Sequence, residues 1–228
     1  MAVVVGLVSQ KGGTGKSTLA RALGAVVAHA GLKVRIADLD PQQHTVLEWQ
    51  RTRSHNRVAP TLDVRGFSTV GQALADADDD ELLILDAPGR VSRRTLQIAE
   101  AADLIVQPSS GSIDDLRPAV VLFHELVEAG IPKDRLVVAL CRTLTQAEED
   151  GARTYIGKAG YAVLAGAIPE RAAHREAHNR GEALTEAKRQ TKDDQVERLM
   201  EALFGKVHTQ LLAKARHAKA ARAKEAKT

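Results

Sequence analysis

Short apolar runs alternate along the chain with longer segments whose apolar residues recur every three or four positions. The short runs have the length and composition of strands buried on both faces of a sheet, and the longer segments have helical spacing. Strand, helix and strand in repetition predict right-handed βαβ units, and therefore an α/β fold. We expect a doubly wound, mostly parallel sheet of about seven strands with helices on both faces. The strands are expected at Val3–Ser9, Val34–Asp40, Leu62–Phe67, Leu82–Asp86, Leu104–Gln107, Leu136–Cys141 and Ala162–Ile168. The helices are expected at Lys16–His29, Thr95–Ala102, Ile113–Ala129 and Ala147–Lys158.

The C-terminal part has a different pattern. From Asp193 to Leu212 the apolar residues form one face of a helix, which we expect to pack on the domain. After Leu212 the large apolar residues stop, and Ala, Lys and Arg take over. The sequence therefore predicts a domain over residues 1–205, followed by a basic helix or tail over 206–228.

Composition and charge narrow the function classes. A chain of 228 residues with 44% hydrophobic and 27% charged residues is typical of one globular domain with or without a tail. The start resembles a strand rather than a signal peptide, and no apolar run reaches the ~18 residues of a membrane span, so a cytoplasmic protein is expected. The single Cys141 excludes an internal disulfide framework and a Cys-based metal cluster within one chain. Residues 206–228 contain seven basic residues and one acidic residue, which favours a polyanionic partner, either nucleic acid or an anionic membrane.

The strongest chemical signal is a glycine-rich loop between the first strand and the first helix. Glycines let the backbone N–H groups approach phosphate oxygens, and the helix N-terminus adds a partial positive charge. Lys16 would reach the β- and γ-phosphates, and the Ser17 hydroxyl would bind Mg²⁺. The loop therefore predicts a nucleotide site. It reads Lys11-Gly12-Gly13-Thr14-Gly15-Lys16-Ser17-Thr18.

This loop departs from the common G-x-x-x-x-G-K-[ST] pattern, because Gln10 occupies the first position and Lys11 follows it. The K-G-G-x-G-K-[ST] form resembles the deviant Walker A loop of the ParA/MinD family of P-loop ATPases. Other segments match this family's later motifs, and the resemblance runs from about Val3 to Met200. It implies the P-loop NTPase fold, with ATP and Mg²⁺ as cofactors. The matching segments are Ile36–Gln42 (D-x-D-P-Q), Leu82–Gly89 (Walker B), and Ala101–Pro108 with Ile113–Leu116.

The resemblance assigns catalytic roles to three residues. Lys11 would be the signature lysine, which reaches across a dimer interface to the partner's nucleotide. Lys16 would hold the phosphates in its own subunit. Asp40 would position the attacking water. These roles agree with phosphoryl transfer, which needs charge neutralisation and an oriented nucleophile.

It also assigns binding roles. Ser17 would bind Mg²⁺ directly, Asp86 would hold it through a water, and Thr18 would contact the α-phosphate. Pro169 lies where the family has an I-P-R-type loop near the adenine, although Glu170 follows it here. The remaining expected cofactor-binding residues are Gly12, Gly13, Thr14, Gly15 and Lys16.

Three features leave alternatives open. Asp38 is either a metal-site residue or a strand-end carboxylate satisfied by backbone N–H groups. His174 and His178 have a spacing that can bind metal, but an exposed helix face is the favoured interpretation. The acidic run over residues 76–81 is expected to be a solvated loop.

Within the family, the cysteine count excludes relatives of the nitrogenase iron protein and of arsenite pumps, and the tail lacks the tyrosines of bacterial tyrosine kinases. The tail offers only alanine to a bilayer, so a membrane partner is not expected. Lys and Arg spaced through an Ala-rich segment suit DNA phosphate contacts. The expected DNA-binding residues are Lys214, Arg216, Lys219, Arg222 and Lys224.

The resemblance thus implies a small ParA-type ATPase, because the chain begins almost at the first strand and leaves no room for an N-terminal helix-turn-helix. Such a protein would form a homodimer on ATP, bind DNA non-specifically, associate with the nucleoid, and partition plasmid, chromosome or other cargo. Its weak ATP hydrolysis would be stimulated by a cargo-bound adaptor of the ParB type. A MinD-like membrane-cycling regulator is the alternative, and a metabolic P-loop enzyme of the dethiobiotin-synthetase kind is a third.

Overall fold

The computed structural model describes residues 2–89, 93–187 and 193–225, with the backbone alone at 218 and 220–225. Its strands are β1 Val3–Leu7, β2 Val34–Asp38, β3 Asp63–Gly66, β4 Leu82–Asp86, β5 Leu104–Ser109, β6 Leu136–Thr143, β7 Ala162–Val163 and β8 Ile168–Pro169. Its α-helices are α1 Lys16–His29, α2 Thr45–His55, α3 Val70–Ala75, α4 Arg93–Ala101, α5 Ile113–Glu128, α6 Gln146–Lys158, α7 Ala172–Asn179 and α8 Asp194–Glu225. Two 3₁₀ turns, η1 Lys133–Arg135 and η2 Leu184–Glu186, complete the described elements.

The strands form one parallel sheet in the order β3-β2-β4-β1-β5-β6-β7, with β8 also paired to β6. β1 lies between β4 and β5, and the chain builds the sheet first on one side of β1 and then on the other. In doubly wound sheets, ligands bind at the carboxyl ends of the strands where this reversal occurs. The predicted fold class is confirmed, and the loop after β1 opens at this position.

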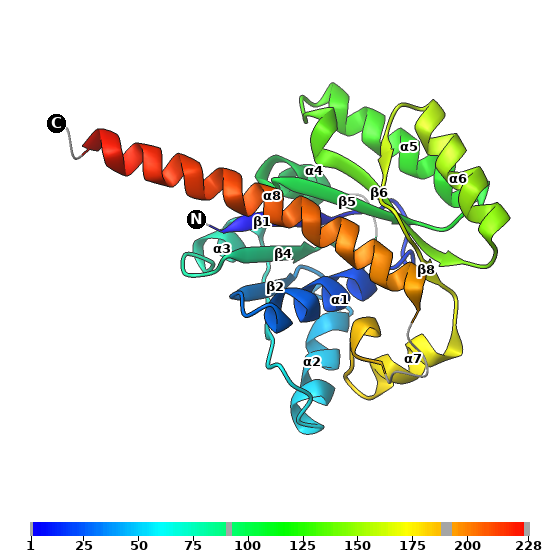
Figure 1. Cartoon of the computed structure of the whole chain (residues 1–228), viewed down its shortest axis with the longest axis horizontal. Coiled ribbons are helices and arrows are strands. Elements are labelled where there is room, and N and C mark those ends of the chain that lie inside the picture. The colour runs from blue at the N-terminus through cyan, green and yellow to red at the C-terminus, as the bar shows by residue number, and fades with distance from the viewer. Residues whose placement is uncertain (1, 90–92, 188–192, 226–228) are drawn as a thin grey trace.

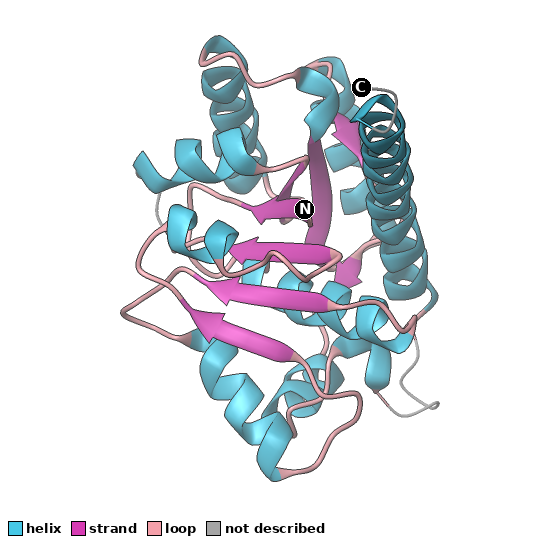
Figure 2. Cartoon of the chain, turned by 90° about the vertical axis from the view of Figure 1, so that its left-hand side faces the viewer, coloured by secondary structure: helices cyan, strands magenta, loops and turns pink. Residues whose placement is uncertain are grey.

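Helices cover both faces of the sheet (Figure 2). A hydrophobic core lies on each face of the sheet, and successive side chains of β1 pack alternately into one core and the other, as expected for a strand buried on both sides. Val3, Val5 and Leu7 belong to the core that also contains α1, α2 and α8. Val4 belongs to the opposite core, which contains α3, α4, α5 and α6. The continuous apolar runs of the sequence follow from this two-sided burial.

The predicted strand Ala162–Ile168 is wrong, because the chain forms two short strands there, β7 and β8. Between them Gly166 adopts a φ of 73°, which favours glycine. The backbone of α8 packs directly on this turn, and a Cβ on Gly166 would lie 2.3 Å from the carbonyl oxygen of Gln195. The turn between β7 and β8 is therefore the surface on which the N-terminal end of α8 packs.

The acidic run before β4 is only partly solvated, contrary to expectation. Arg35 on β2 is buried and forms ion pairs with Asp76 and Asp80 from this run and with Asp63 on β3. A buried guanidinium needs such compensation. Asp76 and Asp80 therefore neutralise a buried arginine rather than simply facing water.

Helix α8 is one continuous helix of 32 residues, so the predicted boundary at residue 206 falls inside it. Its first half packs on the sheet through Val196, Leu199, Leu203 and Val207. Its last turns extend past the body, as Figure 1 shows in red. Across the described residues, no helix has the length and apolar character needed to cross a membrane.

Candidate nucleotide-binding site

The glycine-rich loop joins β1 to α1 and has the backbone geometry that its sequence predicts. Gly13 and Gly15 adopt φ values of 75° and 115°, and Gly15 caps the N-terminus of α1. A Cβ on Gly15 would lie 3.1 Å from that of the buried Cys141, at the end of β6. Both backbone conformation and space therefore favour glycine at residue 15.

Lys16 points into this loop. It is 5% exposed, and its Nζ donates to the Ser9 hydroxyl at 2.7 Å and to the Lys11 carbonyl at 3.3 Å. Burial lowers the pKa of Lys16, while the carboxylates of Asp86 and Asp40 oppose that shift. A buried cation beside an α-helix N-terminus is suited to bind the charged end of a nucleotide.

Ser17 and Asp86 come together at the end of β4. The Ser17 hydroxyl donates to Oδ2 of Asp86 at 2.7 Å, and the other carboxylate oxygen, Oδ1, is buried without a hydrogen-bond partner. Burial raises the pKa of Asp86 to about 7. Mg²⁺ takes oxygen ligands and keeps several waters. The hydroxyl and the partly unsatisfied carboxylate therefore fit the predicted Mg²⁺ site.

Asp38 is a strand-end carboxylate that accepts hydrogen bonds from backbone N–H groups, the second of the two interpretations offered by the sequence. Its carboxylate accepts the N–H groups of Asp40, Val46 and Leu47 at 3.0, 3.1 and 3.3 Å. The segment between β2 and α2 is thereby tied to the end of β2. Asp40, on this segment, reaches the same cavity as Lys16, and its Oδ1 accepts the N–H of Gln42.

These groups line one cavity of about 480 Å³, a size typical of small-molecule sites. The loop after β1 forms one end of it, the phosphate end, where the sequence predicts the nucleotide phosphates. Apart from Thr14, the residues predicted to bind phosphate or metal and the one predicted to lie near the base all border it. The lining includes Gly12, Gly13, Gly15, Lys16, Ser17, Thr18, Asp40, Asp86 and Pro169. Thr14, in the same loop, is buried, and its hydroxyl donates to the Ser9 hydroxyl at 3.1 Å.

The far end of the cavity is formed by α7, and here the interpretation of an exposed histidine face is wrong. His174 and His178 both line the cavity. His174 is 7% exposed and its Nδ1 lies 3.0 Å from the carbonyl oxygen of Pro169. Burial, followed by the charge of Arg21, lowers the pKa of His178 to about 4. Within the described part of the chain, no group of three or more His, Cys, Asp or Glu residues is arranged to hold a metal.

Arg142 also borders the cavity, which the sequence did not predict. It follows Cys141 with a φ of 59°, and its guanidinium donates to the carbonyl of Gly13 at 3.0 Å and to Glu170 at 2.9 Å. Glu170 in turn pairs with Arg175 of α7. Arg142 thereby links the phosphate end of the cavity to its far end.

Lys11 does not enter this cavity. Its side chain is 46% exposed and its Nζ lies 2.9 Å from the carboxylate of Asp115 and 2.6 Å from the carbonyl oxygen of Asp114, at the start of α5. Asp115 is held in turn by the Ser110 hydroxyl at 2.6 Å. The two lysines of one loop thus have different surroundings, one buried at the phosphate end and one held at the surface.

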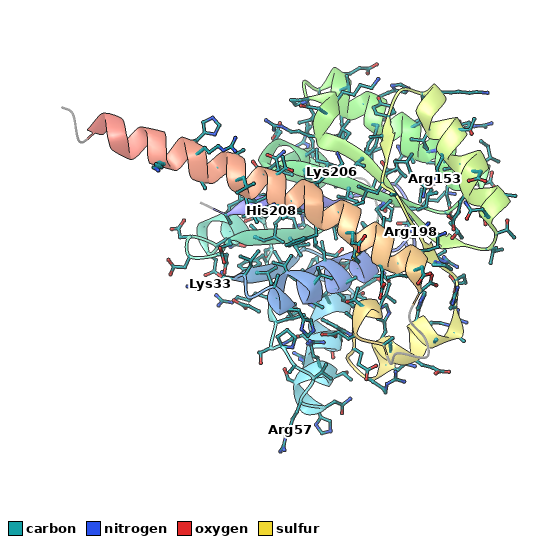
Figure 3. The ribbon with its side chains drawn as sticks, in the orientation of Figure 1. Lys33, Arg57, Arg153, Arg198, Lys206 and His208 are labelled. Atoms are coloured by element: carbon teal, nitrogen blue, oxygen red, sulfur yellow. The ribbon has the colours of Figure 1, made fainter. Side chains whose placement is uncertain are left out.

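The predicted DNA-binding residues are not equivalent. Lys214 forms an ion pair with Asp103 at 2.6 Å and donates to the carbonyl of Ala2, so it fastens α8 to the body. Arg216 and Lys219 are exposed on the projecting turns. The side chains of Arg222 and Lys224 lie outside the described residues. In Figure 3, Arg198, Lys206 and His208 lie along the earlier part of the same helix.

Comparison with known proteins adds to this geometry. The model of the CobQ/CobB/MinD/ParA nucleotide-binding domain matches residues 5–184. The chain belongs to this family. The match begins within β1 and ends at the first residue of η2, so every residue that lines the cavity lies within this CobQ/CobB/MinD/ParA domain.

Named relatives and solved structures agree with the family. The chain is 32% identical over 105 residues to a Rhizobium radiobacter protein named ParA (46% of this chain, 47% of that protein). It is 30% identical over 165 residues to the chromosome-partitioning ATPase Soj of Thermus thermophilus (58% of this chain, 66% of Soj). The chain thus spans about half to two thirds of these curated relatives.

Among solved structures, it resembles the septum site-determining protein MinD of Pyrococcus horikoshii, complexed with Mg-ADP. The TM-score is 0.69 at 17% identity, and the match covers 89% of this chain and 96% of MinD. At this identity the likeness shows the shared fold alone.

Proposed function

We propose that this chain is a ParA-type ATPase that dimerises on ATP, binds DNA without sequence preference and moves or positions a cargo. The observation that carries the proposal is the pair of lysines on one loop. Lys16 is buried at the phosphate end of the cavity, whereas Lys11 is held at the surface by Asp115. A lysine outside its own cavity is suited to act on a second subunit's nucleotide, as an arginine finger acts in trans. ATP turnover by the purified protein, together with its sedimentation with and without ATP, tests this function.

The residues of the cavity divide the reaction among them. Lys16 and the backbone N–H groups of the loop bind the β- and γ-phosphates. Asp40 orients the attacking water. Mg²⁺, held by Ser17 and through a water by Asp86, would neutralise charge on the phosphate oxygens. Lys11 of the partner subunit adds positive charge as the bond to the leaving group breaks.

Lys11→Ala is expected to bind ADP normally but to lose the ATP-dependent dimer, because the trans contact disappears. Asp115→Asn is the matched variant, since it removes the ion pair that holds Lys11 and keeps an acceptor for Ser110. An exposed ion pair contributes at most about 1 kcal/mol, so Asp115→Asn should tighten the dimer by up to about fivefold per subunit. Sedimentation with ATP and Mg²⁺ measures dimer formation by both variants. A normal dimer in Lys11→Ala would contradict the trans role.

DNA binding is proposed for the projecting end of α8, because its exposed basic residues stand clear of the body. Each phosphate contact contributes about −0.9 to the slope of log K against log salt on duplex DNA. Deletion of residues 213–228 should weaken binding to all sequences alike and make this slope shallower. ATP hydrolysis without DNA should survive, because the deletion lies beyond every nucleotide motif.

The deletion also removes Lys214, which fastens α8 to the body, so a second variant is needed. Arg216→Gln combined with Lys219→Gln keeps the pair between Lys214 and Asp103, and it should reduce the salt slope by up to about 1.8 per subunit. Both variants are compared with the full chain, each with ATP, on unrelated duplexes and on anionic vesicles. Unchanged DNA affinity with lost vesicle binding would favour the MinD-like membrane alternative.

A further inference from the structure

Arg21 is a buried cation at the edge of the nucleotide cavity that no motif includes. It lies on α1 four residues after Ser17, and residues with this spacing share one face of a helix. Only 8% of the residue is exposed, yet it lines the cavity. Burial lowers the pKa of Arg21 to about 10, and Asp86 and Asp38 oppose the shift, so the guanidinium stays charged at neutral pH.

The guanidinium of Arg21 has two partners on α2. Its Nη2 donates to the carbonyl oxygen of Thr45, the first residue of α2, at 2.7 Å. Its Cζ lies 5.3 Å from the centre of the Trp49 ring, within the range of a cation–π interaction. Arg53 lies at the same distance from this ring and is itself fixed by Glu186. The start of α2 is therefore held against α1 by Arg21, and the last turn of α2 is held against η2 by Arg53.

The segment that precedes Thr45 carries Asp40. Asp38 binds the N–H groups of this segment and of the first turn of α2, and Arg21 binds a carbonyl in the same stretch. His44 lies between Asp40 and Thr45 in this segment, and its backbone adopts a φ of 46°, which residues other than glycine rarely take. The segment is thus held in a strained backbone conformation by two buried charges of opposite sign.

We propose that Arg21 is a positioning residue for ATP hydrolysis, which fixes the segment from Asp40 to Thr45 so that Asp40 meets the attacking water. The inference rests on the proposed ATPase function and deepens it. Arg21 acts through the Thr45 carbonyl and the Trp49 ring and not by touching the phosphates. Its loss therefore affects the hydrolytic step and leaves nucleotide affinity in place.

The test compares Arg21→Met, Arg21→Lys and the control Arg51→Ala, which removes an arginine from α2 whose side chain is 75% exposed. A lost hydrogen bond from a buried charged donor corresponds to a decrease in kcat of about tenfold to a hundredfold. We expect this decrease in Arg21→Met, with KM for ATP and Kd for ADP within about threefold of the parent. Arg21→Lys keeps the charge and should recover part of kcat, and Arg51→Ala should match the parent.

Amide hydrogen exchange supplies a readout that does not depend on turnover. In Arg21→Met the amides of residues 40–47 should exchange faster, while those of β1 and of the first turn of α1 keep the parent rate. A parent protein without ATP turnover would contradict the proposed function, and the exchange data would still test the positioning role. Unchanged exchange in residues 40–47, unchanged kcat, or a Kd for ADP weakened as much as kcat would each overturn the inference. Equal protection of the β1 amides in parent and variant shows that the variant is folded.

Discussion

Replacing Asp40 by alanine is expected to stop ATP turnover while ATP binding and dimerisation persist. Asp40 reaches the cavity from the segment after β2, and its carboxylate is the group assigned to orient water. Groups that orient or deprotonate a nucleophile typically contribute about 10²–10⁴ in rate. The residues proposed to hold the phosphates and the metal are Lys16 and Ser17, not Asp40, so affinity for ATP should change little. A steady-state ATPase assay and sedimentation with ATP measure the two effects.

Asp40→Asn is the control, because an amide oxygen can still accept the N–H of Gln42 that the carboxylate accepts. If turnover falls in both variants, the negative charge of Asp40 is needed. If Asp40→Asn retains turnover and Asp40→Ala does not, the side chain acts by holding its own loop. Normal turnover in Asp40→Ala would remove Asp40 from the mechanism.

Lys16→Ala should abolish turnover and also weaken nucleotide binding, in contrast to Asp40→Ala. Lys16 is buried and its charge faces the phosphate end of the cavity, where a transferring phosphoryl group develops its charge. Loss of one preorganised donor at such a position costs about 10²–10³ in kcat. Titration calorimetry with ADP should show an affinity at least about tenfold weaker, since the ammonium group contacts phosphate in the ground state as well. Parent-like ADP affinity would mean that Lys16 does not bind the β-phosphate.

The sequence predicted the parts of the site that are contiguous in the chain. The loop from Lys11 to Thr18 was found because it follows a buried strand and opens a helix, and the ends of β2 and β4 were found because they resemble the later motifs of the ParA/MinD family. Parallel strands bring their carboxyl ends to one edge of the sheet, so their proximity follows from the fold class. The structure brings Lys16, Ser17, Asp40 and Asp86 to one cavity.

The parts that escaped prediction come from single residues on elements that approach each other only in the folded chain. The helix carrying His174 and His178 was expected, but the two histidines were placed on an exposed face, because a local sequence pattern does not reveal which part of the folded chain covers a polar face. α2 was missed for a related reason, since Arg53 occupies a buried position that an apolar residue would normally mark. A φ above zero at Arg142 or His44 likewise leaves no trace in a pattern of apolar residues.

The tail illustrates the limit of charge counting. Lys214 contributes to the basic character of residues 206–228, yet its charge is paired with Asp103 on the body. The net charge of a segment therefore overstates the charge available to a polyanion. The acidic run before β4 shows the same limit for negative charge, since two of its carboxylates form ion pairs with the buried Arg35.

The continuity of α8 has a mechanical consequence. A helix of 32 residues is about 48 Å long, and a single unbroken helix behaves as a stiff rod over that length. Its far end projects from the body, while its near end rests on the Gly166 turn that leads into β8, and β8 supplies Pro169 to the nucleotide cavity. One rigid element therefore connects the projecting turns, the ion pair between Lys214 and Asp103, and the turn that leads to the wall of the cavity.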